Sequence, residues 1–124
     1  MASVMVIDDD ADVVEAISMV LTLEGFGVLV AESEHDALAL ADAHRPCLIL
    51  VDFRMPGIDP ERLITKLHER VSTLVVLCTG ADVAKGVFQK SGADVLLRKP
   101  FTIDELLEIA KEAAKTYPAP VATP

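Results

Sequence analysis

Short apolar runs alternate with longer segments of helical periodicity along most of the chain. The runs at residues 47–52 and 73–78 are almost wholly apolar, as expected of strands covered on both faces. We predict strands near residues 3–8, 27–31, 47–52, 73–78 and 94–98. We predict helices near residues 11–24, 34–44, 60–70, 82–91 and 102–116. This strict alternation predicts an α/β fold with a five-stranded parallel sheet, right-handed crossovers and helices on both faces.

Local signals support these boundaries. Gly25 and Gly92 follow two of the predicted helices, where a residue at positive φ ends a helix at little cost. Capping residues are predicted ahead of three helices: Ser33, Asp59 and Thr102. The helical pattern stops at Tyr117, and residues 118–124 contain three prolines among small residues. We therefore predict one domain over residues 1–117, followed by a Pro-rich tail or the start of a linker at residues 118–124.

Composition narrows the classes of protein that the chain can represent. Its 124 residues suit one domain, and a formal charge of −9 argues against direct nucleic-acid binding by this domain. No apolar run approaches the roughly 20 residues that span a bilayer, and the first residues lack a secretory signal. Cys47 and Cys78 lie in apolar runs, so we predict buried free thiols and a reducing, cytoplasmic setting.

Charged residues follow three of the apolar runs: Asp8, Asp9 and Asp10, then Asp52, then Lys99. If these runs are neighbouring parallel strands, their carboxyl ends meet in one crevice. Two carboxylates ~4 Å apart repel by about 4 kcal/mol at an effective dielectric constant near 20. Lys99 supplies one compensating charge, and a hard divalent ion with oxygen ligands, Mg²⁺, is predicted to supply the rest. Asp10 is predicted only to begin the first helix.

From Val4 to about Tyr117 the chain resembles the receiver domains of two-component response regulators. The resemblance rests on five motifs in order: Asp8-Asp9-Asp10, Asp52, Met55-Pro56-Gly57, Thr79-Gly80 and Lys99-Pro100-Phe101. It implies a flavodoxin-like, three-layer (βα)5 sandwich. It also implies a signalling domain that takes a phosphoryl group from a phosphohistidine, and whose partner is a sensor histidine kinase or a histidine phosphotransfer protein. The downstream protein that it would control is not identified by the sequence.

The same resemblance assigns a role to each site residue. Asp52 would be the phospho-acceptor, and Mg²⁺ would be bound by Asp8, Asp9, Asp52 and the main-chain carbonyl of Arg54. Thr79 would donate its hydroxyl to the phosphoryl group, and Lys99 would form an ion pair with it. The Lys99–Pro100 bond resembles one that is often cis in the family. Such a domain catalyses only its own phosphorylation and dephosphorylation, so we do not class it as an enzyme.

The chain departs from the family pattern at three places. One is Pro60, following Asp59, where a glycine is common; it is predicted to stiffen the start of the third helix without touching the chemistry.

The other two departures affect the face made by the fourth helix, the fifth strand and the fifth helix. Leu96 stands where the family often has an aromatic residue that turns inward with Thr79 on phosphorylation. The segment between Thr79 and Lys99 is also shorter than usual, which predicts a short or displaced fourth helix. We therefore expect the chemistry to be kept and the output mechanism to differ. The Arg54 side chain is predicted to lie near the site and to affect the lifetime of the acyl phosphate.

Other residues are predicted to lie on the surface. On the first helix, Val13, Ile17 and Val20 are predicted to form a stripe that packs on the core. Val14 and Leu21 lie off that stripe, and two alternatives stay open for them: ordinary surface apolar residues, or a docking patch for a kinase or phosphotransfer domain. Solvated histidines without partners are predicted at three positions: His35, His44 and His68.

Two other classes of function remain open. An Mg²⁺-dependent phosphohydrolase would need a second aspartate two residues after Asp52, where this chain has Arg54, and a cap insertion that the chain lacks. An unphosphorylated interaction module would keep the fold without the switch, and Leu96 keeps this alternative open. The sequence identifies neither the pathway, the output nor the oligomeric state, nor whether the domain is part of a longer chain.

Overall fold

The computed structural model describes residues 1–80 and 85–119. The strands are β1 (Ser3–Ile7), β2 (Gly27–Ala31), β3 (Leu48–Asp52), β4 (Leu74–Thr79) and β5 (Val95–Arg98). The helices are α1 (Ala11–Leu23), α2 (Glu34–His44), α3 (Pro60–Arg70), α4 (Lys85–Ser91) and α5 (Ile103–Thr116). The predicted boundaries agree with these elements to within one residue, except that predicted helical residues 82–84 lie outside the described part of the chain. The predicted tail also lies mostly outside it, at residues 120–124.

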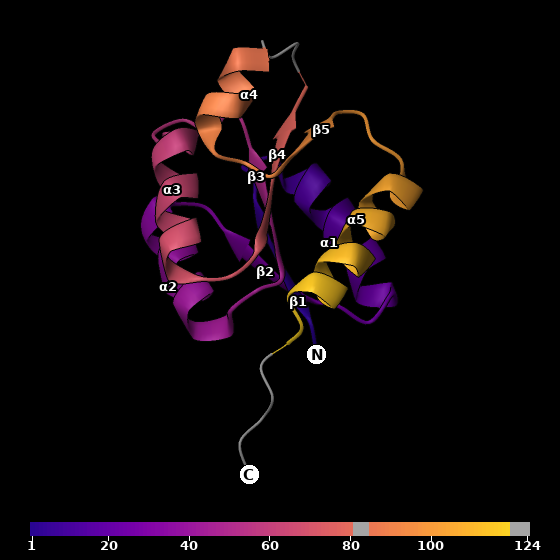
Figure 1. Ribbon diagram of the computed structural model, residues 1–124. Coiled ribbons are helices and arrows are strands. Elements are labelled where there is room, and N and C mark those ends of the chain that lie inside the picture. Colours follow the sequence, from indigo (N-terminus) through magenta and orange to yellow (C-terminus); the bar gives the residue numbers. More distant parts are fainter. Residues whose placement is uncertain (81–84, 120–124) are drawn as a thin grey trace.

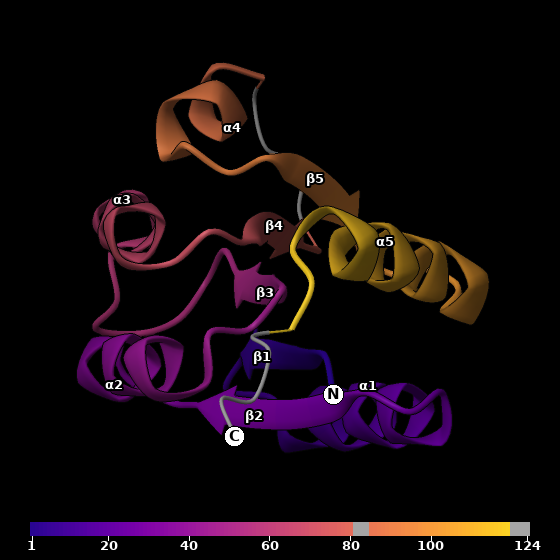
Figure 2. The same cartoon turned by 60° about the horizontal axis from the view of Figure 1, so that its bottom comes forward.

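All five strands are parallel and follow the order β2-β1-β3-β4-β5. Helices α1 and α5 cover one face of the sheet, and α2 and α3 cover the other, with α4 beside α3 (Figures 1 and 2). This confirms the predicted three-layer α/β fold, and the strand order is the flavodoxin-like one. The order changes direction at the neighbouring strands β1 and β3, which is where open sheets of this type bind ligands.

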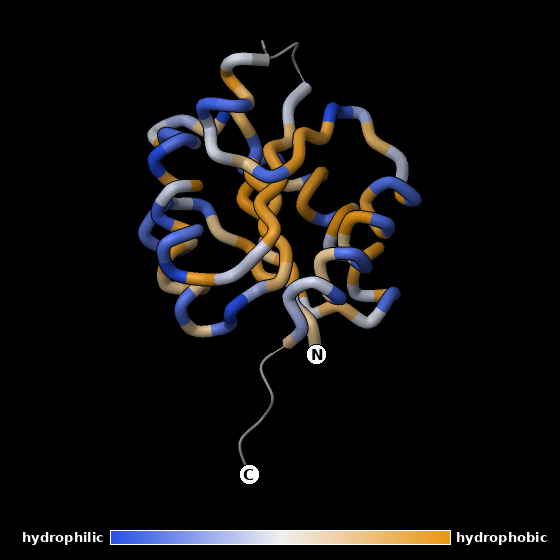
Figure 3. The backbone as a smooth tube through the Cα atoms, in the orientation of Figure 1, coloured by the Kyte–Doolittle hydropathy of each residue, from blue (hydrophilic) through white to orange (hydrophobic). Residues whose placement is uncertain are grey.

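The core has two apolar layers, one on each face of the sheet. Figure 3 shows that hydrophobic residues are concentrated along the central strands. Successive side chains of a strand point to opposite faces, so Val4 and Val6 belong to the layer under α1 and α5. Met5 and Ile7 belong to the layer under α2 and α3. The central strands are buried on both sides, which explains why their sequences are apolar throughout rather than alternating. The two cysteines are buried and free, as predicted.

The predicted caps and helix ends are confirmed. Ser33, Asp59 and Thr102 each accept a hydrogen bond at 3.1 Å from a backbone N–H in the first turn of their helix. Gly92 directly follows α4 and adopts a φ of 82°, and Gly25 lies two residues after the end of α1 with a φ of 90°. The helix boundaries are therefore set by local chemistry that is visible in the sequence.

The prediction of a docking patch formed by Val14 and Leu21 on α1 is wrong. Leu21 is fully buried and Val14 packs against the same core layer as Ile17. Leu21 follows Ile17 by four residues, and residues at this spacing share one face of a helix. The large apolar side chains of α1 that are exposed are instead Met19 and Leu23.

His68 also departs from the prediction, whereas His35 and His44 are exposed. The Nε2 atom of His68 lies 3.0 Å from Oδ2 of Asp94, and the same oxygen accepts a hydrogen bond of 2.8 Å from the Val75 N–H. The partner was missed because it lies 26 residues further along the chain, just ahead of β5. Among the described residues, no helix combines the length and apolar character needed to cross a membrane.

Candidate functional site

The parallel register brings the predicted site residues to one end of the sheet. Ile7 of β1 pairs with Val51 of β3, so the next residues, Asp8 and Asp52, emerge beside each other. Asp52 in turn pairs with Cys78 of β4. Lys99 follows the last residue of β5, and its backbone N–H donates a hydrogen bond of 2.8 Å to the carbonyl of Thr79. Four strand ends therefore contribute to one crevice, as the sequence predicts.

Asp8 is the most constrained group in this crevice, with only 5% of its side chain exposed. Its Oδ2 lies 2.9 Å from the Lys99 ammonium, and its Oδ1 accepts a hydrogen bond of 2.9 Å from the Asp10 backbone N–H. Both carboxylate oxygens are therefore held, one by a cation and one by an amide. The sequence reasoning missed this contact of Asp10, because it depends on the backbone path between β1 and α1.

Asp52 and Lys99 form the second ion pair of the crevice, with 3.5 Å between Oδ1 and Nζ. Burial raises the pKa of the Asp52 carboxyl, and the charge of Asp8 raises it further, against the opposing effects of Lys99 and the Arg54 backbone N–H. Burial by itself lowers the pKa of Lys99, but the hydrogen bond with Asp8 and the charges of both carboxylates outweigh it and leave that pKa raised. The lysine is therefore fully charged, while Asp52 ionises at a cost.

Oxygens of Asp8, Asp9 and Asp52 all lie within 4.8 Å of one another. Three carboxylates so close carry more negative charge than the single ammonium of Lys99 compensates. The donors are hard oxygens, and Asp9 is exposed, so solvent reaches the cluster. Mg²⁺ prefers this combination of a few carboxylate oxygens and water. The residues present fit a divalent cation. Whether the Arg54 carbonyl joins them stays a prediction.

Thr79 and Leu96, the predicted switch residues, lie in different surroundings. Thr79 is 2% exposed and ends β4 beside the crevice. Leu96 is half-buried in β5, pairs with Leu77 and packs against the core layer under α2 and α3. The switch role of Thr79 and Leu96 stays a prediction. The Arg54 side chain is exposed, two residues beyond the end of β3.

Cys78 lies beneath the charged groups, on the same face of the sheet as Asp52. Burial raises the pKa of its thiol to about 12, so the group stays protonated at neutral pH. The thiol therefore adds no charge to the crevice. The Lys99–Pro100 peptide bond at the rim is cis, as predicted.

An apolar groove adjoins the crevice, between the first half of α1 and the segment that links β5 to α5. Its volume is about 400 Å³, and it is lined by Val13, Ala16, Ile17, Lys99, Pro100 and Phe101. The sequence reasoning did not find this groove. Its signal was the stripe of Val13 and Ile17, which the prediction assigned wholly to the core.

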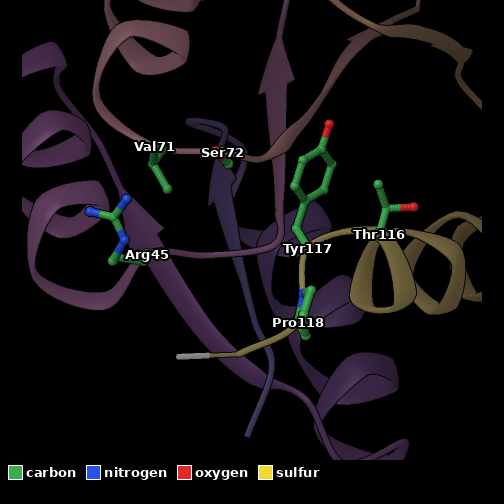
Figure 4. Close-up of a pocket in the computed structure, with 6 residues that line it drawn as sticks. All are labelled: Arg45, Val71, Ser72, Thr116, Tyr117 and Pro118. Carbon is green, nitrogen blue, oxygen red and sulfur yellow. The ribbon is translucent and has the colours of Figure 1, made fainter. Parts of the chain in front are cut away.

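A pocket of about 330 Å³ lies at the amino ends of β3 and β4, far along the sheet from the crevice. Figure 4 shows its lining residues, Arg45, Val71, Ser72, Thr116, Tyr117 and Pro118. It brings together none of the predicted site residues. The candidate site is therefore the crevice at the carboxyl ends of the strands.

Comparison with known proteins agrees with this geometry. Residues 4–111 match the family model of the response regulator receiver domain. The chain belongs to this family. A receiver domain is the phosphoryl-accepting part of a two-component response regulator, so the resemblance seen in the sequence and the flavodoxin-like fold are both confirmed.

Individual relatives show how much of each protein the receiver domain covers. It is 34% identical over 113 residues to the transcriptional regulatory protein PrrA of Mycobacterium tuberculosis, covering 87% of this chain and 48% of that protein. It is 32% identical over 119 residues to the DNA-binding transcriptional regulator NtrC of Proteus hauseri, covering 93% of this chain and 25% of that protein. The chain thus spans a quarter to about half the length of these relatives.

The solved structures agree with the fold. A CheY-like response regulator receiver domain protein from Methanospirillum hungatei JF-1 superposes with a TM-score of 0.83 at 27% identity. The match covers 94% of this chain and 96% of that one, so the likeness extends over nearly the whole receiver domain.

Proposed function

We propose that this receiver domain accepts a phosphoryl group from a phosphohistidine onto Asp52, and that Mg²⁺ is held by Asp8, Asp9, Asp52 and the main-chain carbonyl of Arg54. One observation carries the proposal. The Lys99 ammonium lies 2.9 Å from Asp8 and 3.5 Å from Asp52, inside a cluster of three carboxylates that one lysine does not neutralise. A site with this charge balance suits a cation together with a phosphoryl group.

In the proposed reaction, a carboxylate oxygen of Asp52 attacks phosphorus. The new P–O bond forms as the P–N bond to the donor imidazole breaks, and that imidazole leaves with the electron pair of the broken bond. Phosphoryl transfer depends mainly on alignment and on compensation of charge at the phosphoryl oxygens. Bound Mg²⁺ supplies positive charge there. Lys99 is already fixed beside Asp52, so it supplies a second positive charge without reorganisation.

The proposed switch acts through β4 and β5. Thr79 donates its hydroxyl to an oxygen of the phosphoryl group, and Leu96 responds by moving inward. Support comes from the position of Thr79 at the end of β4 and from its backbone link to Lys99. The resulting change at the surface of α4, β5 and α5 would alter binding to a downstream protein. The domain acts only on its own aspartate, so we do not class it as an enzyme.

The proposed phosphodonor is a sensor histidine kinase or a histidine phosphotransfer protein. The apolar groove beside Lys99 supports this, because a donor must place its histidine within reach of Asp52 while excluding water. Its lining residues, among them Val13, Ile17 and Phe101, suit the apolar face of a helix. We also propose that this domain itself does not bind nucleic acid directly. A cytoplasmic location stays a prediction, which the two buried free thiols support.

A second candidate is an interaction module without the switch. The observation that favours it is Leu96 in β5, which offers no aromatic ring. Such a module would bind its partner equally well whether or not Asp52 is modified.

The test is intact-mass spectrometry of the protein after incubation with acetyl phosphate and Mg²⁺. We expect the mass of one added phosphoryl group, and its absence from Asp52→Asn and from metal-free samples. Beryllofluoride, which mimics the acyl phosphate, is the second arm for a receiver that accepts only from its kinase. If the wild type gives no adduct and binds no beryllofluoride, the phospho-acceptor proposal is wrong and the interaction module replaces it.

A further inference from the structure

The carboxylate of Asp8 cannot turn without breaking a bond, because it is held at both oxygens. Lys99 holds Oδ2 and the Asp10 backbone N–H holds Oδ1, each at 2.9 Å. The ion pair links Asp8 to Lys99 after β5, and the hydrogen bond from the Asp10 amide links it to the start of α1. The direction in which Asp8 presents its oxygens to a cation therefore depends on where the Asp10 amide points.

The Asp10 side chain fixes that amide. Asp10 is the N-cap of α1, with extended backbone angles of φ −84° and ψ 106°. Its Oδ1 accepts hydrogen bonds from the N–H groups of Asp12 at 3.0 Å and Val13 at 3.3 Å. Its carbonyl accepts a hydrogen bond of 3.0 Å from the Val14 N–H. One residue is thus tied to the first turn of α1 by its side chain and to Asp8 by its amide.

Helix α1 is itself held in place by the core. Ile17 is 6% exposed and Leu21 is fully buried in the layer under α1 and α5. The cap therefore transmits the position of a packed helix to the site. Asp59 offers a direct comparison, because it caps α3 with the same chemistry: its Oδ1 accepts hydrogen bonds from Glu61 at 3.1 Å and Arg62 at 3.4 Å. Among the described residues, no hydrogen bond links the backbone N–H of Asp59 to a carboxylate of the candidate site.

We propose that Asp10 is a positioning residue for Asp8: its side chain, by capping α1, aims its own backbone N–H at Asp8 and so sets the geometry of the cation site. This inference rests on the proposed function of Asp8 as a metal ligand. Groups that orient a ligand without touching the metal typically change metal affinity about 10- to 100-fold when removed. Without the cap, Asp8 keeps Lys99 and loses its fixed second partner.

The main experiment compares D10A with D10N in the full chain by titration calorimetry with Mg²⁺. Both substitutions remove one negative charge, but only D10N keeps an oxygen that can cap the helix. We expect D10A to bind Mg²⁺ about tenfold more weakly than D10N. If D10A fails to fold, D10G takes its place, because glycine at an N-cap costs little stability and also lacks the capping oxygen. Equal affinities for the capped and uncapped variants would overturn the proposal.

The control is D59A, which removes the matched cap from α3. We expect its Mg²⁺ dissociation constant to stay within about twofold of the wild-type value, because Asp59 contacts only the backbone of its own helix in its capping role. An equal weakening in D59A and D10A would show that loss of any helix cap loosens the site, and the proposal would fail.

A readout without metal separates this inference from the proposed function. Hydrogen exchange of the residue-10 amide is measured in Mg²⁺-free protein, with D8A as the baseline that lacks the acceptor. We expect D10N to keep wild-type protection and D10A to exchange about as fast as D8A. If D10A keeps full protection, Asp10 does not position Asp8. If wild type binds no Mg²⁺ while D10A loses protection, the proposed metal site fails but the positioning of Asp8 by Asp10 stands.

Discussion

The carboxyl ends of β1 and β3 differ sharply from the neighbouring region of β4, α4 and β5. In the first region, Asp8 is 5% exposed and each of its oxygens has a close partner. In the second, Leu96 is half-buried and Val87 is 40% exposed. The two regions share one sheet, but Asp8 in the first is held by charged and polar contacts, whereas Leu96 in the second is held by apolar packing.

The difference has a physical cause. A partly buried carboxylate without its partner leaves an uncompensated charge, which destabilises the fold strongly. A half-buried apolar side chain can be exchanged for another of similar size at a cost usually below about 1.5 kcal/mol. Removing the Lys99 charge should therefore cost more stability than a size-conserving exchange of Leu96. Leu96, one of the predicted departures from the family pattern, lies in this apolar surrounding.

Removing Lys99 should have the largest effect. In metal-free Lys99→Ala, Asp8 and Asp52 lose the ammonium that lies 2.9 and 3.5 Å away. We expect the free energy of unfolding to fall by about 2 kcal/mol, less than for a fully buried pair because the lysine is partly exposed. Mg²⁺ should restore more stability to this variant than to the wild type, because it replaces the lost charge. Denaturant unfolding with and without Mg²⁺ measures both effects.

Lys66→Ala is the matched control for that experiment. Lys66 forms an exposed ion pair with Glu34 at 3.4 Å, and such pairs contribute about 1 kcal/mol or less. Its unfolding free energy should change little, and Mg²⁺ should act on it as on the wild type. An equal loss in the two variants would remove the distinction between the two regions.

The pH dependence of Asp52 sharpens the comparison, with a smaller effect. Its pKa in the folded protein lies above the ordinary value of 3.8, so the folded state holds this proton more tightly than the unfolded state does. Ionised Asp52 therefore destabilises the metal-free protein. The cost is absent well below pH 3.8, grows as pH rises through the folded pKa and is constant above it. Asp52→Asn should be more stable than wild type at pH 7, by less than the loss in Lys99→Ala. A difference that shrinks with rising pH would contradict the raised pKa.

Shortening Leu96 should have the smallest effect. We expect Leu96→Ala to lower the free energy of unfolding by about 1 kcal/mol, below the range for fully buried leucines, because Leu96 is only half-buried. The rate of phosphoryl adduct formation should stay within about twofold of wild type, since the side chain lies outside the charged crevice. Leu74→Ala, a half-buried leucine at the amino end of β4, is the control. Loss of the adduct in Leu96→Ala alone would tie this residue to the chemistry.

Much of the fold followed from the sequence, because the signals that set the elements are local. Asp59 and Thr102 cap the helices that they were predicted to cap, and the apolar runs became the strands. The two errors have different causes. Leu21 was placed outside the core stripe although it lies four residues after Ile17, a spacing that puts both on one helix face, so the local signal was present and was misread. His68 contacts Asp94, which lies 26 residues further along the chain, and that contact leaves no trace in a short window of sequence.

The sequence by itself determined the α/β alternation and the presence of carboxylates and a lysine at the ends of apolar runs. Charge repulsion then required a cation wherever those ends met. Only the tertiary structure decided that the strand order β2-β1-β3-β4-β5 brings Asp8 beside Asp52, and that Lys99 lies closer to Asp8 than to Asp52. It also decided that the Asp10 amide faces Asp8. Strand order and backbone direction depend on how all the elements pack together, and no local pattern encodes them.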